Sequence, residues 1–198
     1  MDTESERIYG CPHPLGVTII DSPRAYNFAV YSKDASKIEL LGLRLIAEPW
    51  GGDTASYMMG RSYPGRNWHQ CNDHFRDTVR SFVKGDVSLI DELKRRLYGS
   101  TDLFPDDIAN ACRRWQSINY IASHDGPNLR DLVSFTNDSF RSWNCGFEGV
   151  NSVPADIFAL RKQQIRNMFC LLMLSNGTPM FVAGDEFMQT QRGCSNSL

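Results

Sequence analysis

Apolar residues occur in three short runs along the chain, and each run ends at an acidic side chain. These runs are LRLIAE at 43–48, ending at Glu48; INYIASHD at 118–125, ending at Asp125; and MFVAGDE at 180–186, ending at Asp185 and Glu186. A short, mostly apolar run bounded by turn residues is typical of a strand that is buried on both faces. The pattern therefore predicts three parallel strands, each of which delivers a carboxylate at its carboxyl end.

Between these runs, apolar residues recur at the spacing of an amphipathic helix. Residues 72–85 are predicted to form such a helix, which Asn72 caps and Gly85 ends. Its expected buried stripe is Phe75, Val79, Phe82 and Val83. Further helices are predicted over 88–99, 128–135 and 152–177, the last with Ser152 as its cap, and an irregular loop over 51–70. This alternation of strands and helices indicates an α/β fold with a parallel sheet.

The first part of the chain shows strand alternation instead, and we expect a small antiparallel β module there. Its last run, 36–41, is separated from the run at 43–48 by Gly42 alone. A hairpin needs about two loop residues and a parallel crossover a dozen or more. Residues 38–47 therefore form one strand bent at Gly42, or two strands that belong to different sheets. The predicted domains are 1–41 and 42–198.

Composition narrows the choice of partners and cellular location. The chain has 198 residues and a formal net charge of −2, so nothing indicates a nucleic-acid partner or an anionic membrane surface. The start, MDTESER, is acidic and lacks the features of a signal or transit peptide, and no apolar run reaches the length of a membrane span. We therefore expect a soluble, cytoplasmic protein.

The cysteines and histidines do not predict a metal site. The six cysteines contain no pair with CxxC spacing, and His69 and His74 are spaced so that they lie on different faces of a helix. A structural zinc site needs clustered ligands. We predict free thiols, no metal and no cofactor.

The strand-end acids are the candidate catalytic residues, because active sites of (β/α)-barrels lie at the carboxyl ends of the strands. Glu48, beside Trp50, and Asp125, beside His124, are suited to cleaving a sugar bond, which needs a carboxylic acid and a second carboxylate. Other interpretations stay open: Glu48 as a loop acid, Asp125 as a helix cap, and the tryptophans as core rather than sugar-stacking residues. We expect Asp185-Glu186 to be structural.

Several long motifs in a fixed order carry a resemblance to a known family. They are LIAEPW, NDHFRDTVRSF, GSTDLF, SINYIASHDGPNLRDLVSF, RSWNCGFEG and LLMLSNGTPMFVAGDEFMQTQRG. Together they resemble the isoamylase-type glycogen debranching enzymes of the α-amylase superfamily, glycoside hydrolase family 13. The resemblance implies the second half of a (β/α)8 TIM barrel over 42–198. It also implies a fragment of an N-terminal β-sandwich, a carbohydrate-binding-like module, over 1–41.

The resemblance also implies a reaction and roles for particular residues. Glu48 matches the general acid/base of the family, Asp125 its transition-state-stabilising aspartate, and His124 the histidine that contacts the sugar; Trp50 is an expected substrate contact. The implied reaction is hydrolysis of α-1,6 branch linkages in glycogen-like glucans through a covalent glycosyl-enzyme, without a cofactor.

The departures from the family are as specific as the matches. The GFRFD-like motif that holds the family's nucleophilic aspartate is absent, and so is the earlier DxxxNH-like motif; both would fall at Gly42. The resemblance thus implies an internally deleted and C-terminally truncated member. Asp53 and Asp73 are the alternatives for a nucleophile, and neither lies at a predicted strand end. Three hypotheses remain: an impaired hydrolase, a non-catalytic glucan-binding protein, and a non-functional remnant whose open barrel edges favour self-association.

Overall fold

The computed structural model describes residues 16–21, 24–29, 45–50, 59–60, 68–105 and 112–195, and the chain divides into two compact units, Met1–Leu43 and Arg44–Leu198. In the first unit, β1 (Gly16–Asp21) and β2 (Arg24–Ala29) form an antiparallel pair with Gly16 opposite Ala29. The strand expected over 36–41 and the junction at Gly42 lie outside the described residues. The β-sandwich therefore stays a prediction.

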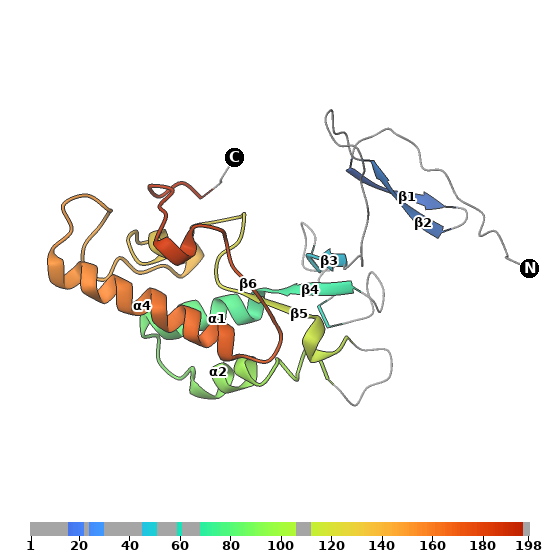
Figure 1. The fold of residues 1–198 in the computed structure, drawn as a ribbon. Helices are drawn as coiled ribbons and strands as arrows, with labels where there is room; N and C mark the ends of the chain where they lie inside the picture. The colour runs from blue at the N-terminus through green and yellow to red at the C-terminus, as the bar shows by residue number, and fades with distance from the viewer. Residues whose placement is uncertain are drawn as a thin grey trace, which may run out of the picture. The chain divides into compact units, whose positions relative to one another are not determined.

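The second unit contains a parallel sheet whose four strands follow one another in chain order (Figure 1). These are β3 (Leu45–Ala47), β4 (Trp68–Asn72), β5 (Ser117–Tyr120) and β6 (Thr178–Met180). All three neighbouring pairs are parallel, so the carboxyl ends of the strands share one edge of the sheet. The predicted α/β fold with a parallel sheet is confirmed.

Strand β4 corrects the prediction of an irregular loop over 51–70. Its polar residues His69, Gln70 and Asn72 are buried, and Gly60 N donates to Gln70 Oε1 at 2.7 Å. Asn72 Nδ2 donates to the hydroxyls of Ser100 and Ser117, each at 2.9 Å. These partners are distant in sequence, so neither hydrophobicity nor alternation indicates the strand. As a consequence Asp73 directly follows a strand end, contrary to the sequence-based expectation.

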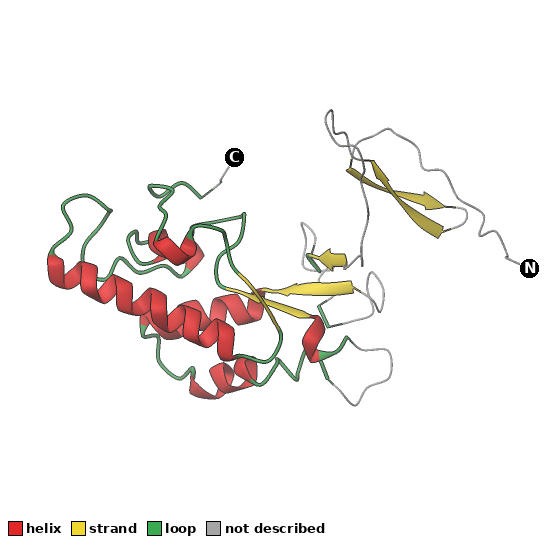
Figure 2. Cartoon of the chain, in the orientation of Figure 1, coloured by secondary structure: helices red, strands yellow, loops and turns green. Residues whose placement is uncertain are grey.

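Four α-helices accompany the sheet (Figure 2). They are α1 (Asp73–Lys84), α2 (Ile90–Leu97), α3 (Leu129–Leu132) and α4 (Ala155–Leu174). Helix α1 has the predicted ends: the Asn72 side chain accepts from Phe75 N, and Gly85 adopts a φ of 98°. The Ser152 cap is wrong, because Pro154 takes the N-cap position of α4 and uses no side-chain bond. The described residues also contain three short 3-10 helices: η2 (Arg114–Gln116), η3 (Asp138–Phe140) and η4 (Asp185–Phe187).

The main core lies where α1 packs against β5, α2 and α4. Phe75 and Val79 of α1 are fully buried in it, whereas Phe82, expected in the same stripe, is exposed. Burial of a side chain of this size contributes about 1.5–3 kcal/mol. A smaller hydrophobic cluster of Cys71, Ile118 and Tyr120 lies where β4 and β5 pair. None of the described helices combines the length and apolar character needed to cross a bilayer.

Candidate active site

Glu48, His124 and Asp125 come together beyond the carboxyl ends of β3 and β5. His124 Nε2 lies 3.7 Å from Glu48 Oε1 and 3.6 Å from Asp125 Oδ2. One polar atom from each of the three side chains lies within 4.8 Å of the other two. Their side chains are 44%, 69% and 76% exposed, in chain order. The cluster is therefore open to a large ligand, and two residues from separate strands meet as the strand-end rule predicts.

The β3 side of the cluster is held by a proline and a tryptophan. Pro49 is buried immediately after Glu48. Trp50 is half-buried and packs against two apolar clusters, Cys71 with Ile118 and Tyr120, and Met59 with Phe104 and Cys112. These contacts anchor the end of the strand next to Glu48. The sugar-stacking role expected for Trp50 stays a prediction.

The β5 side is held by burial along the whole strand and into the following turn. Every residue of β5 is buried, and so are Ile121 and Ala122 after it. Beyond the pair His124-Asp125, Gly126 N donates to Ser195 O at 2.7 Å. Asn128, not Asp125, caps α3, because its side chain accepts from Asp131 N at 2.9 Å. Helix capping thus does not explain the position of Asp125.

The two acids after β6 have structural partners and lie outside the cluster. Asp185 is buried; its Oδ1 accepts from Leu129 N at 2.9 Å and its Oδ2 from Val182 N at 3.3 Å. Burial raises the pKa of Asp185, and the two backbone bonds oppose that rise. Glu186 accepts from Gly184 N at 2.8 Å. Both side chains thus fit the structural role that the sequence suggested.

Cys71 is a nucleophilic group near the candidate site, and its surroundings keep it unreactive. Burial, together with the nearby carboxylates of Glu48 and Asp73, raises the pKa of its thiol to about 11. A thiol with such a pKa stays protonated at neutral pH, and the thiolate is the reactive form. Cys71 therefore does not replace the nucleophile that the sequence lacks. The other described cysteines are also free, as predicted.

The same three site residues are the one group of His, Cys, Asp or Glu side chains, within the described residues, whose ligand atoms could reach a common ion. They are all exposed, and a closed structural metal site normally has four ligands. Their arrangement is equally suited to binding sugar hydroxyls, because carboxylates accept hydrogen bonds and imidazole both donates and accepts them.

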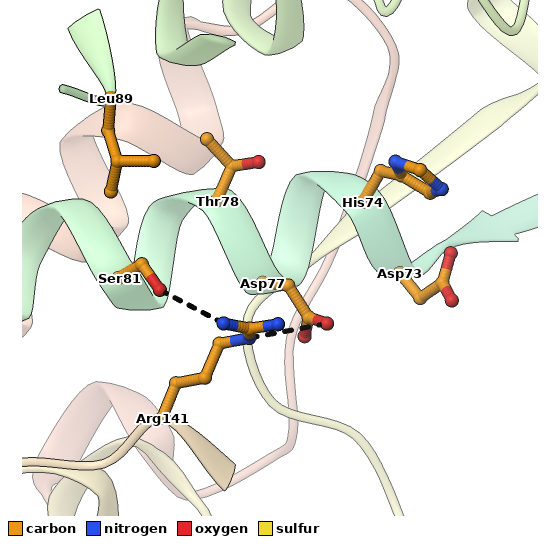
Figure 3. A pocket seen from close by; sticks show the side chains of 7 residues that line it. All are labelled: Asp73, His74, Asp77, Thr78, Ser81, Leu89 and Arg141. Atoms are coloured by element: carbon orange, nitrogen blue, oxygen red, sulfur yellow. Dashed lines mark hydrogen bonds and ion pairs between the residues drawn. The ribbon is translucent and has the colours of Figure 1, made fainter. Parts of the chain in front are cut away.

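A cavity of about 300 Å³ beside α1 was not foreseen from the sequence (Figure 3). Its lining runs along the helix from Asp73, directly after β4, to Ser81, and is closed by Arg141. Arg141 lies 3.5 Å from Asp77 Oδ2 and donates to Ser81 Oγ at 3.4 Å (Figure 3). Two charged groups of the lining, Arg141 and Asp77, thus pair with each other. They are far apart in sequence, so the sequence did not predict that they would meet.

Sequence comparisons find relatives among glycogen- and starch-related proteins, although no protein-family model matches the chain. A "Glycogen operon protein GlgX homolog" from Mycobacterium bovis is 42% identical over 168 residues, which are 78% of this chain and 22% of that protein. A "Glycogen debranching enzyme" from Erwinia tasmaniensis is 37% identical over 172 residues, or 78% and 25%. "Isoamylase 1, chloroplastic" from Oryza sativa is 34% identical over 206 residues, or 96% and 25%. The chain thus spans about a quarter or less of the length of these relatives.

Structure comparison finds pullulanases. The enzyme from Bacillus acidopullulyticus matches 77% of this chain and 18% of its own, with a TM-score of 0.55 and 23% identity. A mutant pullulanase from Paenibacillus barengoltzii, complexed with maltotetraose, matches 77% and 23%, with a TM-score of 0.55 and 23% identity. At this identity the likeness shows the fold alone. The relatives in sequence, not this likeness, show that the matched part of the chain is homologous to isoamylase-type glycogen debranching enzymes.

Proposed function

We propose that the chain carries part of an α-1,6-glucosidase site that acts on branch linkages of glycogen-like glucans. The observation that carries this proposal is the meeting of Glu48 and Asp125 around His124, with contacts of 3.7 and 3.6 Å. The names of the relatives support the substrate class, since they refer to glycogen debranching and isoamylase. The parallel strand order supports an arrangement as the second half of a (β/α)8 barrel.

In this proposal Glu48 is the general acid and base. Its carboxyl protonates the glycosidic oxygen as the bond to the sugar carbon breaks, and its carboxylate then takes a proton from the attacking water. Such proton transfer contributes about 10²–10⁴ in rate. Asp125 and His124 bind ring hydroxyls, and the Asp125 carboxylate stabilises the positive charge of the oxocarbenium-like transition state. Trp50 contributes contact with the sugar.

The reaction of a retaining enzyme also needs a carboxylate nucleophile on the far side of the sugar carbon. The sequence holds no match to the family's nucleophile motif, and Asp53 lies outside the described residues. Removing one donor from an electrostatic site already costs about 10²–10³ in rate, and loss of a nucleophile is expected to cost at least as much. We therefore infer hydrolysis that is much slower than that of a complete site.

The missing nucleophile favours a second candidate, glucan binding without hydrolysis. Native-gel retardation in glycogen separates the two candidates, since binding needs no nucleophile. Location in the cytoplasm and self-association through barrel edges stay predictions in either case.

The test is an assay of reducing ends released from branched glucan by the purified chain. Glu48→Gln is expected to lower the rate about 100-fold or more, because the amide cannot transfer the proton. Glu186→Gln is the matched control, since Glu186 also follows a strand but lies outside the cluster and its amide oxygen can still accept from Gly184 N. Equal rates for the two variants, or no release by the unmodified chain, would contradict hydrolysis at Glu48.

A further inference from the structure

Arg80 is a buried cation on α1 that bonds to the turn carrying the candidate site. It is 5% exposed. Its Nε and Nη2 donate to Ile121 O at 2.8 and 2.5 Å, and its Nη1 donates to Phe140 O at 3.1 Å. All three bonds join the guanidinium to backbone carbonyls, so this planar donor links α1 to the turn after β5 and to η3.

The two segments that Arg80 joins lie on either side of His124 and Asp125 along the chain. Ile121 directly follows β5 and precedes the pair. Gly126 directly follows the pair, and a Cβ added there would come within 3.4 Å of the Phe140 ring. Arg80 therefore bonds directly to the Ile121 carbonyl before His124 and Asp125. Through the Phe140 carbonyl it also fixes the residue whose ring lies beside Gly126, just after them.

The charge of Arg80 strengthens these contacts. Burial lowers the pKa of Arg80 to about 10, and the neighbouring Arg76 acts in the same direction, so the side chain stays charged at neutral pH. Hydrogen bonds from a charged donor are worth about 1.5–3 kcal/mol, more than neutral ones. An apolar side chain here would leave the carbonyl of Ile121 buried without this donor.

We propose that Arg80 is a positioning residue for the candidate site: it holds the His124–Asp125 segment where the two side chains meet Glu48. The importance of that arrangement for hydrolysis rests on the proposed function. The arrangement itself can be measured without turnover, because Glu48 lies close enough to His124 to affect the imidazole electrostatically.

The experiment compares two buried arginines. Arg161 is 2% exposed, and it donates to Gly149 O at 2.8 Å, to Asn144 O at 3.0 Å and to Phe147 O, none of which belongs to the His124–Asp125 turn. Arg80→Met and Arg161→Met each remove a buried cation from backbone carbonyls, so both are expected to lower stability. Only Arg80→Met should displace the turn.

The readout is the imidazole Cε1–H resonance of His124, assigned with His124→Gln and followed before and after Glu48→Gln. In the unmodified chain and in Arg161→Met, removing the Glu48 charge should shift this resonance by similar amounts. In Arg80→Met the shift should fall to less than about half, because a site displaced by as little as 0.5 Å loses its geometry. Arg80→Lys, which keeps the charge but lacks the several N–H donors of the guanidinium, should restore part of the shift of the His124 resonance.

Three outcomes would overturn the proposal: no response of His124 in the unmodified chain, equal responses in the two methionine variants, and full restoration of an Arg80→Met defect by an unrelated stabilising condition such as an osmolyte. If Arg80→Met does not fold, the same comparison is made between Arg80→Lys and Arg161→Lys, with a reduced response expected only in the former. An inactive chain with the expected His124 responses would contradict the proposed hydrolysis and leave the positioning role supported.

Discussion

The two sides of the candidate site are held very differently. Asp125 follows β5, all of whose residues are buried, and the turn between them is bonded to α1 through Arg80. Glu48 follows β3, a strand of three residues in which Ile46 is 51% exposed. Asp125, the proposed sugar-binding residue, is thus attached to the core, whereas Glu48, the proposed proton donor, depends mainly on the packing of Pro49 and Trp50 just beyond it.

The position of each strand in the sheet explains part of this difference. β5 lies between β4 and β6 and is paired on both sides, whereas β3 is paired within the described residues with β4 alone. A strand with ladders on both edges has more of its backbone groups bonded, and its faces are covered by helices in α/β folds. The β5 side of the candidate site is therefore held more firmly than the β3 side. The largest losses should therefore follow changes near β5.

The largest effect is expected from a matched pair of isoleucines. Ile121→Ala, in the turn after β5, removes a side chain that is 1% exposed and should lower the free energy of unfolding by about 3 kcal/mol. Ile46→Ala, in β3, truncates a half-exposed side chain and should lower it by less than about 1 kcal/mol. Urea unfolding with an unchanged slope measures both. Equal losses would show that the two sides are held alike.

A second, smaller loss is expected from Asp131→Ala. The buried carboxylate of Asp131 accepts from Thr190 Oγ1 at 2.5 Å, from Gln191 N at 2.9 Å and from Gly193 N at 3.0 Å. It thereby fixes the segment whose Ser195 carbonyl accepts from Gly126 N, next to Asp125. Part of this segment is exposed and can bond to water after the change, so we expect a loss of about 2 kcal/mol.

Asp138→Ala is the control for Asp131→Ala, because the Asp138 side chain is 93% exposed and should contribute less than about 0.5 kcal/mol. Proteolysis then locates the effect: the Asp131 variant should be cut sooner in the segment 190–195 than the control. Unchanged cutting there would mean that Asp131 stabilises the molecule without bracing the β5 side.

The sequence predicts the helix ends and the meeting of strand ends, and it misses the long-range polar contacts. Helix α1 was predicted with both ends because Asn72 and Gly85 act on their own helix. The meeting of Glu48 and Asp125 was predicted because strand ends of a parallel sheet share an edge. Strand β4 and the contacts of Arg80 were missed, since their polar groups are bonded to residues that are far away along the chain. Hydrophobic patterns carry no information about such partners.

A third prediction concerns Asn128, which ties α3 to the segment after β6. Its side chain caps α3 by accepting from Asp131 N at 2.9 Å, and its Nδ2 donates to Gln189 O at 2.7 Å. Asn128→Ala should therefore lower the free energy of unfolding by about 1 kcal/mol, the usual contribution of a cap. Asn137→Ala, at the exposed cap of the short η3, should have a smaller effect in the same thermal melts. The reverse order would indicate that η3 supports the site more than α3 does.

The smallest effect is a pH dependence that reports the burial of the β5 side. Burial raises the pKa of Asp185, which bonds to Leu129 N at the start of α3. As pH falls, the folded chain therefore takes up a proton at Asp185 before the unfolded chain does. The stability that this group adds grows from its raised pKa down to the ordinary value of an aspartate, and is fully present below that value. That added stability is lost as pH rises again through the raised pKa. Asp185→Asn cannot take up the proton, and its stability relative to the unmodified chain should decline as the pH is lowered from 7 towards 4.

Urea midpoints measured across this pH range test the expectation, and Asp138→Asn accounts for the loss of one negative charge at an exposed position. A difference between the Asp185 variant and the unmodified chain that does not change with pH would mean that the carboxyl is hydrated in the folded state. In that case water reaches the contact between α3 and the turn after β6, and the β5 side would resemble the exposed β3 side. The difference in how firmly the two sides of the site are held would then depend only on Arg80 and on the burial of β5.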